Sequence, residues 1–151
     1  MKILKIICIS AAAILLTLCF GCGSDECGEK DLQKKERKFL FGMRDDPENV
    51  MDFVAVSADS AVIAAAKGQL SKPVEERNLH INGVIAYGNG GHNLSWSWHF
   101  VPHQWSLAEM SIELCDGNPL LVEQDIDYWV GTVGRFCPWS SYVKKELPVS
   151  Q

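Results

Sequence analysis

The longest run of apolar positions in the chain lies at its N-terminus. Lys2 and Lys5 precede the stretch Ile6–Leu18, which contains only apolar and small residues. This stretch is shorter than the roughly 20 apolar residues that a membrane-spanning helix needs, and charged residues follow soon after it. Such an order is typical of a secretory signal peptide. We therefore predict an export signal over residues 1–21, absent from the mature protein; an uncleaved N-terminal anchor is the alternative.

The end of this segment resembles the motif that directs lipid attachment to a cysteine. Gly21 before Cys22 fits the motif, whereas Cys19 stands where a branched aliphatic residue is usual. An acylated Cys22 would anchor the protein stably, because several acyl chains would enter the bilayer. We expect a lipid-anchored protein of the cell envelope. Ordinary signal-peptidase cleavage, giving a secreted or periplasmic protein, is the alternative; both locations are extracytoplasmic.

The composition changes between the signal and the rest of the chain. Residues 22–38 are rich in charged side chains with almost no apolar spacing, which predicts a solvated tether. Residues 39–151 carry the regular apolar patterns and are long enough for one domain with its own core.

Within 39–151 the apolar positions follow the periods of strands and helices. The elements so predicted are strands over Phe39–Met43, Phe53–Val56, Leu79–Tyr87, Leu94–Phe100 and Ala108–Leu114, and helices over Ala58–Gln69 and Pro119–Val130. Strands and two helices in this order predict a single α+β domain, with two helices packed against a mainly antiparallel sheet.

Local signals mark several element ends. Ser57 or Asp59 can cap the first helix and Asn118 the second, and Gly131 is expected to end the second helix. Gly83 indicates a bulge in the third strand. The segment Pro102–Gln104 is expected to turn the chain, so that the strands before and after it form a hairpin.

Charge and cysteine content narrow the function classes. Loss of Lys2 and Lys5 with the signal leaves 12 of the 14 basic residues against 19 acidic ones, a formal charge of −7. Such a chain is a poor partner for nucleic acid. Cys115 and Cys137 are the two cysteines of the patterned region, and export predicts a disulfide between them. Cys27 is then unpaired, or bonded to Cys22 if that residue is not lipidated.

Three segments resemble a known protein family. They are Trp96-Ser97-Trp98-His99-Phe100, the stretch Ile112–Pro119, and Cys137-Pro138-Trp139-Ser140-Ser141. In this order they are similar to the N-terminal domain of an amoebal calmodulin-binding protein, a domain also found alone in small secreted bacterial proteins. The resemblance implies an extracytoplasmic binding domain, since no catalytic activity is established for the family. Calmodulin itself is not implied as a partner, because that name belongs to the longer amoebal protein.

Aromatic and polar residues near the predicted hairpin turn and the C-terminal segment suit a sugar or peptide. The candidate ligand-binding residues are Trp105, Trp139, His99, Tyr142 and His103. We expect a non-catalytic domain that binds an unknown protein, peptide or sugar at one surface containing Trp105, His99 and Trp139, with no cofactor and no metal.

Two alternatives remain open. An extracytoplasmic hydrolase or metal-dependent enzyme could use His99 and His103 with Glu109 and Glu113 across the predicted hairpin. The zinc-protease and nucleophile-elbow motifs are both missing from the sequence, which disfavours this alternative. A secreted protein-interaction or inhibitor domain could instead present the loop Gly88–Asn93 together with the turn Pro102–Trp105.

Overall fold

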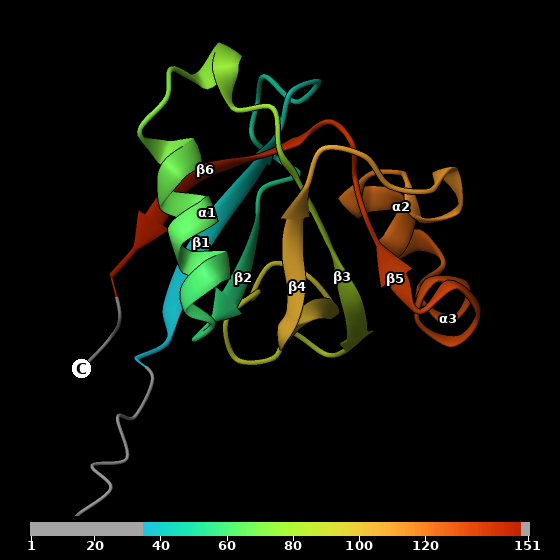
Figure 1. Cartoon of the computed structure of the whole chain (residues 1–151). Helices are drawn as coiled ribbons and strands as arrows, with labels where there is room; N and C mark the ends of the chain where they lie inside the picture. The colour runs from blue at the N-terminus through green and yellow to red at the C-terminus, as the bar shows by residue number, and fades with distance from the viewer. Residues whose placement is uncertain (1–34, 149–151) are drawn as a thin grey trace, which may run out of the picture. The chain divides into compact units, whose positions relative to one another are not determined.

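The computed structural model describes residues 35–148 (Figure 1). Its elements are β1 (Arg37–Met43), β2 (Phe53–Ser57), α1 (Ser60–Leu70), η1 (Val74–Glu76), β3 (His80–Tyr87), β4 (Trp98–Ala108), η2 (Glu113–Cys115), α2 (Pro119–Gln124), α3 (Ile126–Tyr128), η3 (Trp129–Val133), β5 (Arg135–Phe136) and β6 (Ser141–Leu147). The predicted export signal, Cys22, Cys27 and the tether up to residue 34 lie outside the described residues. Because β1 begins at Arg37, the last two residues assigned to the tether belong to a strand.

The strands form two antiparallel sheets of three strands each. One sheet has the order β2-β1-β6 and the other the order β4-β3-β5. Helix α1 packs against β6 and β4, whereas α2 and α3 lie on the side of β5 (Figure 1). The predicted single α+β domain with antiparallel pairing is confirmed. The C-terminal segment 141–147 is an additional strand, because it pairs with β1 along its length.

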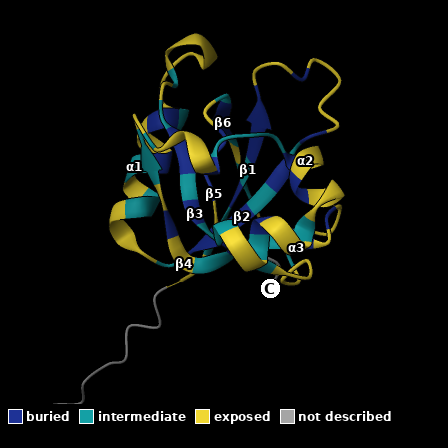
Figure 2. Ribbon diagram, turned by 90° about the vertical axis from the view of Figure 1, so that its right-hand side faces the viewer, coloured by how far each residue is buried: buried dark blue, intermediate teal, exposed yellow. Residues whose placement is uncertain are grey.

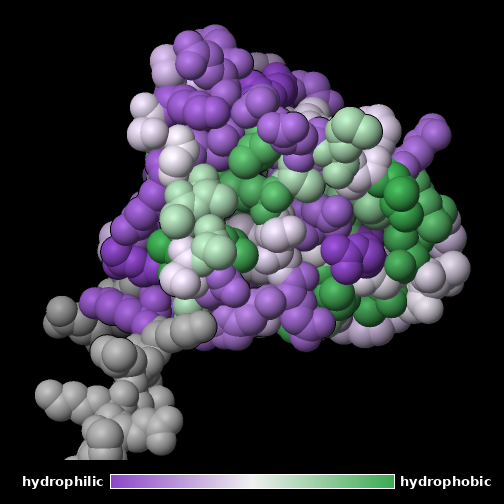
Figure 3. All heavy atoms as spheres, in the orientation of Figure 1, coloured by the Kyte–Doolittle hydropathy of each residue, from purple (hydrophilic) through white to green (hydrophobic). Residues whose placement is uncertain are grey.

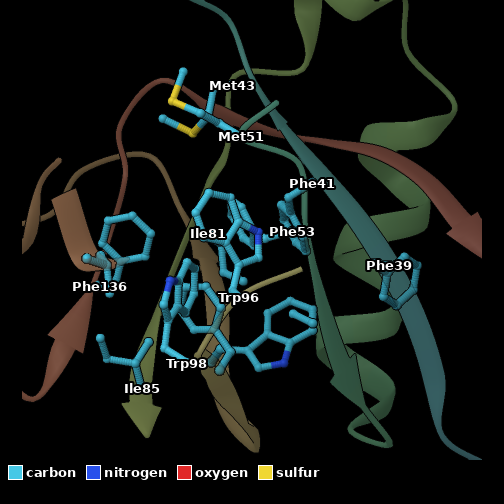
Figure 4. Packing of buried hydrophobic residues seen from close by; sticks show 14 of the residues in the cluster. Phe39, Phe41, Met43, Met51, Phe53, Ile81, Ile85, Trp96, Trp98 and Phe136 are labelled. Carbon is cyan, nitrogen blue, oxygen red and sulfur yellow. The ribbon is translucent and has the colours of Figure 1, made fainter. Parts of the chain in front are cut away.

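Aromatic side chains fill the space between the two sheets. Phe53 stacks on Phe41 with ring centroids 5.4 Å apart, and Trp98 meets Phe136 edge to face at 5.4 Å. Figure 4 shows these rings converging from strands of both sheets. In Figure 2 the strands are mostly buried, while the outer faces of the helices and the loops are exposed. The core therefore fixes the sheets to each other through large rings with defined packing geometry.

Strand β2 is paired with β1 along one edge, and side chains satisfy its other edge. Four hydrogen bonds join backbone groups of alternate residues along this edge to side chains of β4 and of the loop before it. We call these four bonds the β2 seam. They are Trp96 Nε1 to Asp52 O (2.9 Å), Val54 N to Asn93 Oδ1 (2.9 Å), Trp105 Nε1 to Val56 O (2.7 Å) and Ala58 N to His103 Nδ1 (2.9 Å). The seam links the two sheets without a strand ladder and leaves these backbone groups paired.

The expected hairpin around Pro102 is wrong. Strand β4 runs through this segment without reversing, and it pairs with β3 on both sides of it. Residues 101–104 lie between the paired residues Phe100 and Trp105, whereas β3 has only Val84 in the corresponding interval. The turn signal of Pro102 therefore marks a large bulge, in which a residue without an N–H and a positive φ of 64° at His103 are tolerated.

The bulge in β3 that Gly83 predicts is present at the same place. A Cβ atom on Gly83 would lie 2.3 Å from Trp105 Cβ. Only glycine lets β4 bring the Trp105 side chain this close to β3 and into the core.

The segment after Ala108 is not a strand. Met110, Ile112 and Leu114 alternate in the sequence, but all three are exposed, and the chain forms only the short helical turn η2. The strand expected from Leu94 begins only at Trp98, and Leu94 is 73% exposed. Alternation alone thus predicted two strand segments that have no neighbouring strand to bond within residues 35–148.

Asp59, one of the two caps expected for the first helix, and Asn118 are the N-caps, whereas one helix end is not where it was predicted. Asp59 Oδ1 accepts from Ala61 N at 2.7 Å, and Asn118 Oδ1 accepts from Leu121 N at 3.0 Å. The second helix is interrupted at Asp125, whose φ of −139° is not helical, and it closes through the π-turn η3. Gly134, with φ of 69°, ends it in place of Gly131.

Replacement of Asn93 by alanine tests the β2 seam. Asn93 accepts from Val54 N and donates to Trp98 O from a buried position, so its loss leaves two buried backbone groups unpaired. We expect Asn93→Ala to lower the free energy of unfolding by about 2–4 kcal/mol in urea denaturation. Asn89→Ala is the matched control, because Asn89 bonds Gly91 N in an exposed loop. Equal losses in the two variants would contradict the structural role of the seam.

Candidate functional site

A cleft of about 230 Å³ lies where the segment after β4 meets the C-terminal segment. It is lined by Asn78, His80, Glu109, Met110, Ser111 and Trp139, and we call it the Trp139 cleft. Trp139 is 47% exposed, which is high for a residue with the largest apolar side chain.

A chain of hydrogen bonds crosses the Trp139 cleft. Trp139 Nε1 donates to Ser111 Oγ at 2.7 Å, and His80 Nε2 lies 2.7 Å from the same oxygen. Because the indole nitrogen can only donate, Ser111 accepts from Trp139 and can direct its own proton to His80. The exposed indole is therefore held in one orientation by a residue that also contacts a buried histidine.

His80 favours its neutral form. Burial lowers the pKa of the imidazole, and the negative charge of Asp116 opposes this shift. Among the described residues no carboxylate is bonded to His80 Nδ1, so the histidine lacks the group that orients the base in a catalytic triad. The serine–histidine pair can hold a polar group of a ligand.

The disulfide between Cys115 and Cys137 links two of the three chain segments that line the Trp139 cleft, the segment after β4 and the segment that contains Trp139. Its Cα atoms are 5.1 Å apart, and Cys137 N donates to Cys115 O at 2.7 Å. Two residues further on, Trp139 N donates to Asp116 Oδ1 at 2.8 Å. The predicted disulfide is thus present, and it supports the cleft directly.

Exposed apolar side chains lie along the chain segment that lines one side of this cleft. Met110 is 87% exposed, and Ile112 and Leu114 are exposed as well. Hydrophobic residues also gather over α2 and the segment before it, at the right of Figure 3. Exposed apolar residues that cluster near a cleft mark a binding surface more often than scattered ones do.

Trp105 does not contribute to an exposed site. It is 3% exposed, meets Phe41 edge to face at 5.7 Å and donates to Val56 O. The expectation that it lies at an exposed turn is wrong, because β4 continues through Pro102. Trp105 is a core residue.

The remaining predicted ligand-binding residues do not line the Trp139 cleft. His103 Nδ1 accepts from Ala58 N, and its Nε2 lies 3.6 Å from Glu36 Oε1 in an open cleft of about 390 Å³ beside the start of α1. Tyr142 is half-buried on β6, with the guanidinium of Arg44 5.2 Å from its ring centre. The structure therefore does not bring the predicted residues to one surface.

His99 is held by the backbone and not by an acidic residue. Its Nδ1 lies 2.6 Å from Gly88 O, and its ring meets that of His92. Glu109 lines the Trp139 cleft and Glu113 lies in the exposed turn η2, so neither forms a cluster with His99 and His103. Within residues 35–148 no group of three or more His, Cys, Asp or Glu side chains could hold a metal ion.

Sequence reasoning missed His80 and Ser111. His80 begins a strand and Ser111 lies in a segment expected to be one, so the sequence pattern assigns both to structure. Their pairing depends on a contact across 31 residues.

Within residues 35–148 none of the helices has the length and apolar character needed to span a membrane.

The family model described as the BP-74 N-terminal domain matches residues 37–150 of this chain. The match begins where β1 begins and spans every described element of the domain. No curated protein and no solved structure matches the chain.

Proposed function

Since the chain belongs to the BP-74 N-terminal domain family, we propose that it is a non-catalytic binding domain of the cell envelope whose ligand enters the Trp139 cleft. The observation that carries this proposal is the exposed indole of Trp139, oriented by Ser111 and fixed by the adjacent disulfide. A rigid, exposed aromatic ring contributes to binding at little cost in conformational entropy.

The disulfide supports a location in an oxidising compartment. The sequence signals add an export signal and a lipid anchor at Cys22, which would tie the domain to a membrane through the charged tether. The resemblance to a domain found alone in secreted bacterial proteins agrees with this location. We do not extend calmodulin binding to this chain, because that property belongs to the longer amoebal protein.

The size of the Trp139 cleft limits the ligand. Its volume of about 230 Å³ is below the roughly 300–1,000 Å³ of pockets that enclose a drug-sized molecule. It suits one side chain or one sugar ring. The exposed apolar residues Met110, Ile112 and Leu114 favour an apolar ligand surface, so we propose a peptide segment of a partner protein that inserts one apolar side chain.

The first test uses a displayed random-peptide library. Wild-type protein is expected to enrich peptides with a shared apolar residue. Trp139→Ala should weaken binding of the enriched peptides about tenfold or more, since a central aromatic is often a hot spot. Its thermal midpoint should stay close to that of the wild type, because the side chain is half exposed. Fluorescence anisotropy of labelled peptides measures both affinities.

Tyr128→Ala is the matched control for the loss of an aromatic side chain. Tyr128 is 43% exposed in α3 and does not line the Trp139 cleft. Its peptide affinity should equal that of the wild type. Equal weakening in both variants would place the binding site elsewhere, and enrichment of glycans on a sugar array with no peptide enrichment would replace the peptide ligand with a sugar.

Membrane fractionation tests the anchor. The wild-type protein is expected in the membrane fraction, with acyl groups on its N-terminal cysteine by mass spectrometry. Cys22→Ala should remove the site of acylation and shift the protein out of that fraction, whereas Cys27→Ala should leave it there. An unmodified N-terminus on the membrane-bound wild type would refute the lipid anchor.

A further inference from the structure

Two histidines meet at the loop between β3 and β4, away from the Trp139 cleft. The rings of His92 and His99 are 5.5 Å apart between centroids and nearly perpendicular, with an interplanar angle of 89°. His92 lies in the glycine-rich loop, and His99 is the second residue of β4. The contact therefore joins this loop to the beginning of a core strand.

Backbone carbonyls fix the tautomer of both rings. His92 Nδ1 lies 2.9 Å from Gly90 O, and His99 Nδ1 lies 2.6 Å from Gly88 O. A carbonyl oxygen can only accept, so each Nδ1 carries the proton and each Nε2 of the neutral ring presents a lone pair. This is the arrangement that metal-binding histidines usually show, with the second nitrogen donating to a carbonyl group.

Neither lone pair has a partner among the described residues. His92 Nε2 is buried without a hydrogen bond, and no hydrogen bond to His99 Nε2 is found in residues 35–148. An unpaired buried acceptor costs free energy and points to a group that completes it, such as water or an ion. A cation that accepts both lone pairs would satisfy the two rings at once.

Gly90 brings the two rings together. A Cβ atom on Gly90 would lie 2.6 Å from His99 Cδ2 and 2.8 Å from His92 Cε1. The Cγ–Cδ2 bond of His99 and the Cε1 atom of His92 therefore both pack against Gly90, and a side chain at this position would push the rings apart. Its φ of 59° is also one that favours glycine.

The ring separation fits one shared ion. With a metal–nitrogen distance of about 2.0–2.1 Å and tetrahedral angles, the centroids of two imidazoles on one ion lie about 5 Å apart. The observed 5.5 Å is close to this value. We propose that Nε2 of His92 and Nε2 of His99 bind one divalent transition-metal ion, such as zinc. Water or a group from a ligand completes the coordination.

The number of protein ligands sets the strength of this site. Structural zinc sites use four protein ligands, whereas here two imidazoles bind the ion. The site should therefore exchange its metal readily and bind zinc with an affinity in the micromolar range.

The sequence suggested His99 and His103 as a pair. His103 Nδ1 instead accepts a hydrogen bond from Ala58 N, and the histidine that lies beside His99 is His92.

Calorimetric titration of the mature protein with zinc chloride tests the proposal. We expect one equivalent of bound zinc in the wild type and at least about tenfold weaker binding in His92→Gln and His99→Gln. His103→Asn is the control, because the asparagine Oδ1 occupies the position of the imidazole Nδ1 and can still accept from Ala58 N. Cys22 and Cys27 are common to all variants, so their contribution cancels in the comparison.

A second measurement on the wild type does not depend on how the variants fold. In nitrogen-15 spectra of the imidazole rings, zinc should shift the Nε2 resonances of His92 and His99 together and leave those of His80 and His103 in place. Binding of less than one equivalent at high micromolar zinc would overturn the proposal. So would unchanged affinity in His92→Gln, or shifts confined to the other two histidines.

Discussion

The structure depends on hydrogen-bond partners for the backbone N–H and C=O groups of β2 along the edge that faces away from β1. An edge strand that packs against a second sheet cannot leave its N–H and C=O groups without partners. Here the partners are side chains, two indole N–H donors, one amide oxygen and one imidazole nitrogen, all supplied by residues 93–105. One contiguous segment thus positions both sheets, and its geometry determines where β4 begins and where it bulges.

Both candidate sites follow from this arrangement. His103 bonds Ala58 N from the bulge, where its φ is positive. Strand β4 continues past Pro102, and Trp105 enters the core. The segment after β4 does not pair with the sheet, and it forms the exposed wall of the Trp139 cleft. The disulfide links this segment to the one that contains Trp139. At the other end of β4, the loop before the strand folds back so that His92 meets His99.

The features that sequence reasoning predicts correctly are mostly those that depend on residues close together in the chain. Asp59 and Asn118 cap their helices because a carboxylate or amide oxygen can bond the N–H groups of the next turn, whatever the rest of the fold does. Gly83 marks its bulge for a similar local reason. The disulfide followed from export and from there being two cysteines in the patterned region. The caps and the bulge carry over to the structure because each needs only near neighbours in the chain.

The failed predictions concern contacts between distant segments. Trp96 resembles a strand residue by its alternation with Trp98, yet its indole bonds Asp52 O, 44 residues away, from a loop. The alternation of Met110, Ile112 and Leu114 indicates a strand, but no neighbouring strand pairs with it in the described part of the chain. The pairing of Ser111 with His80, and of His92 with His99, likewise depends on the tertiary fold, and no local pattern encodes it.

Amide hydrogen exchange of β2 tests the role of side chains at its second edge most directly. If side chains take the place of a neighbouring strand, the amides of Val54 and Ala58 should be protected. Their exchange should be as slow as that of Phe53 and Ala55, which pair with β1. Exchange of Val54 as fast as that of Gly90, in the exposed loop, would contradict the account.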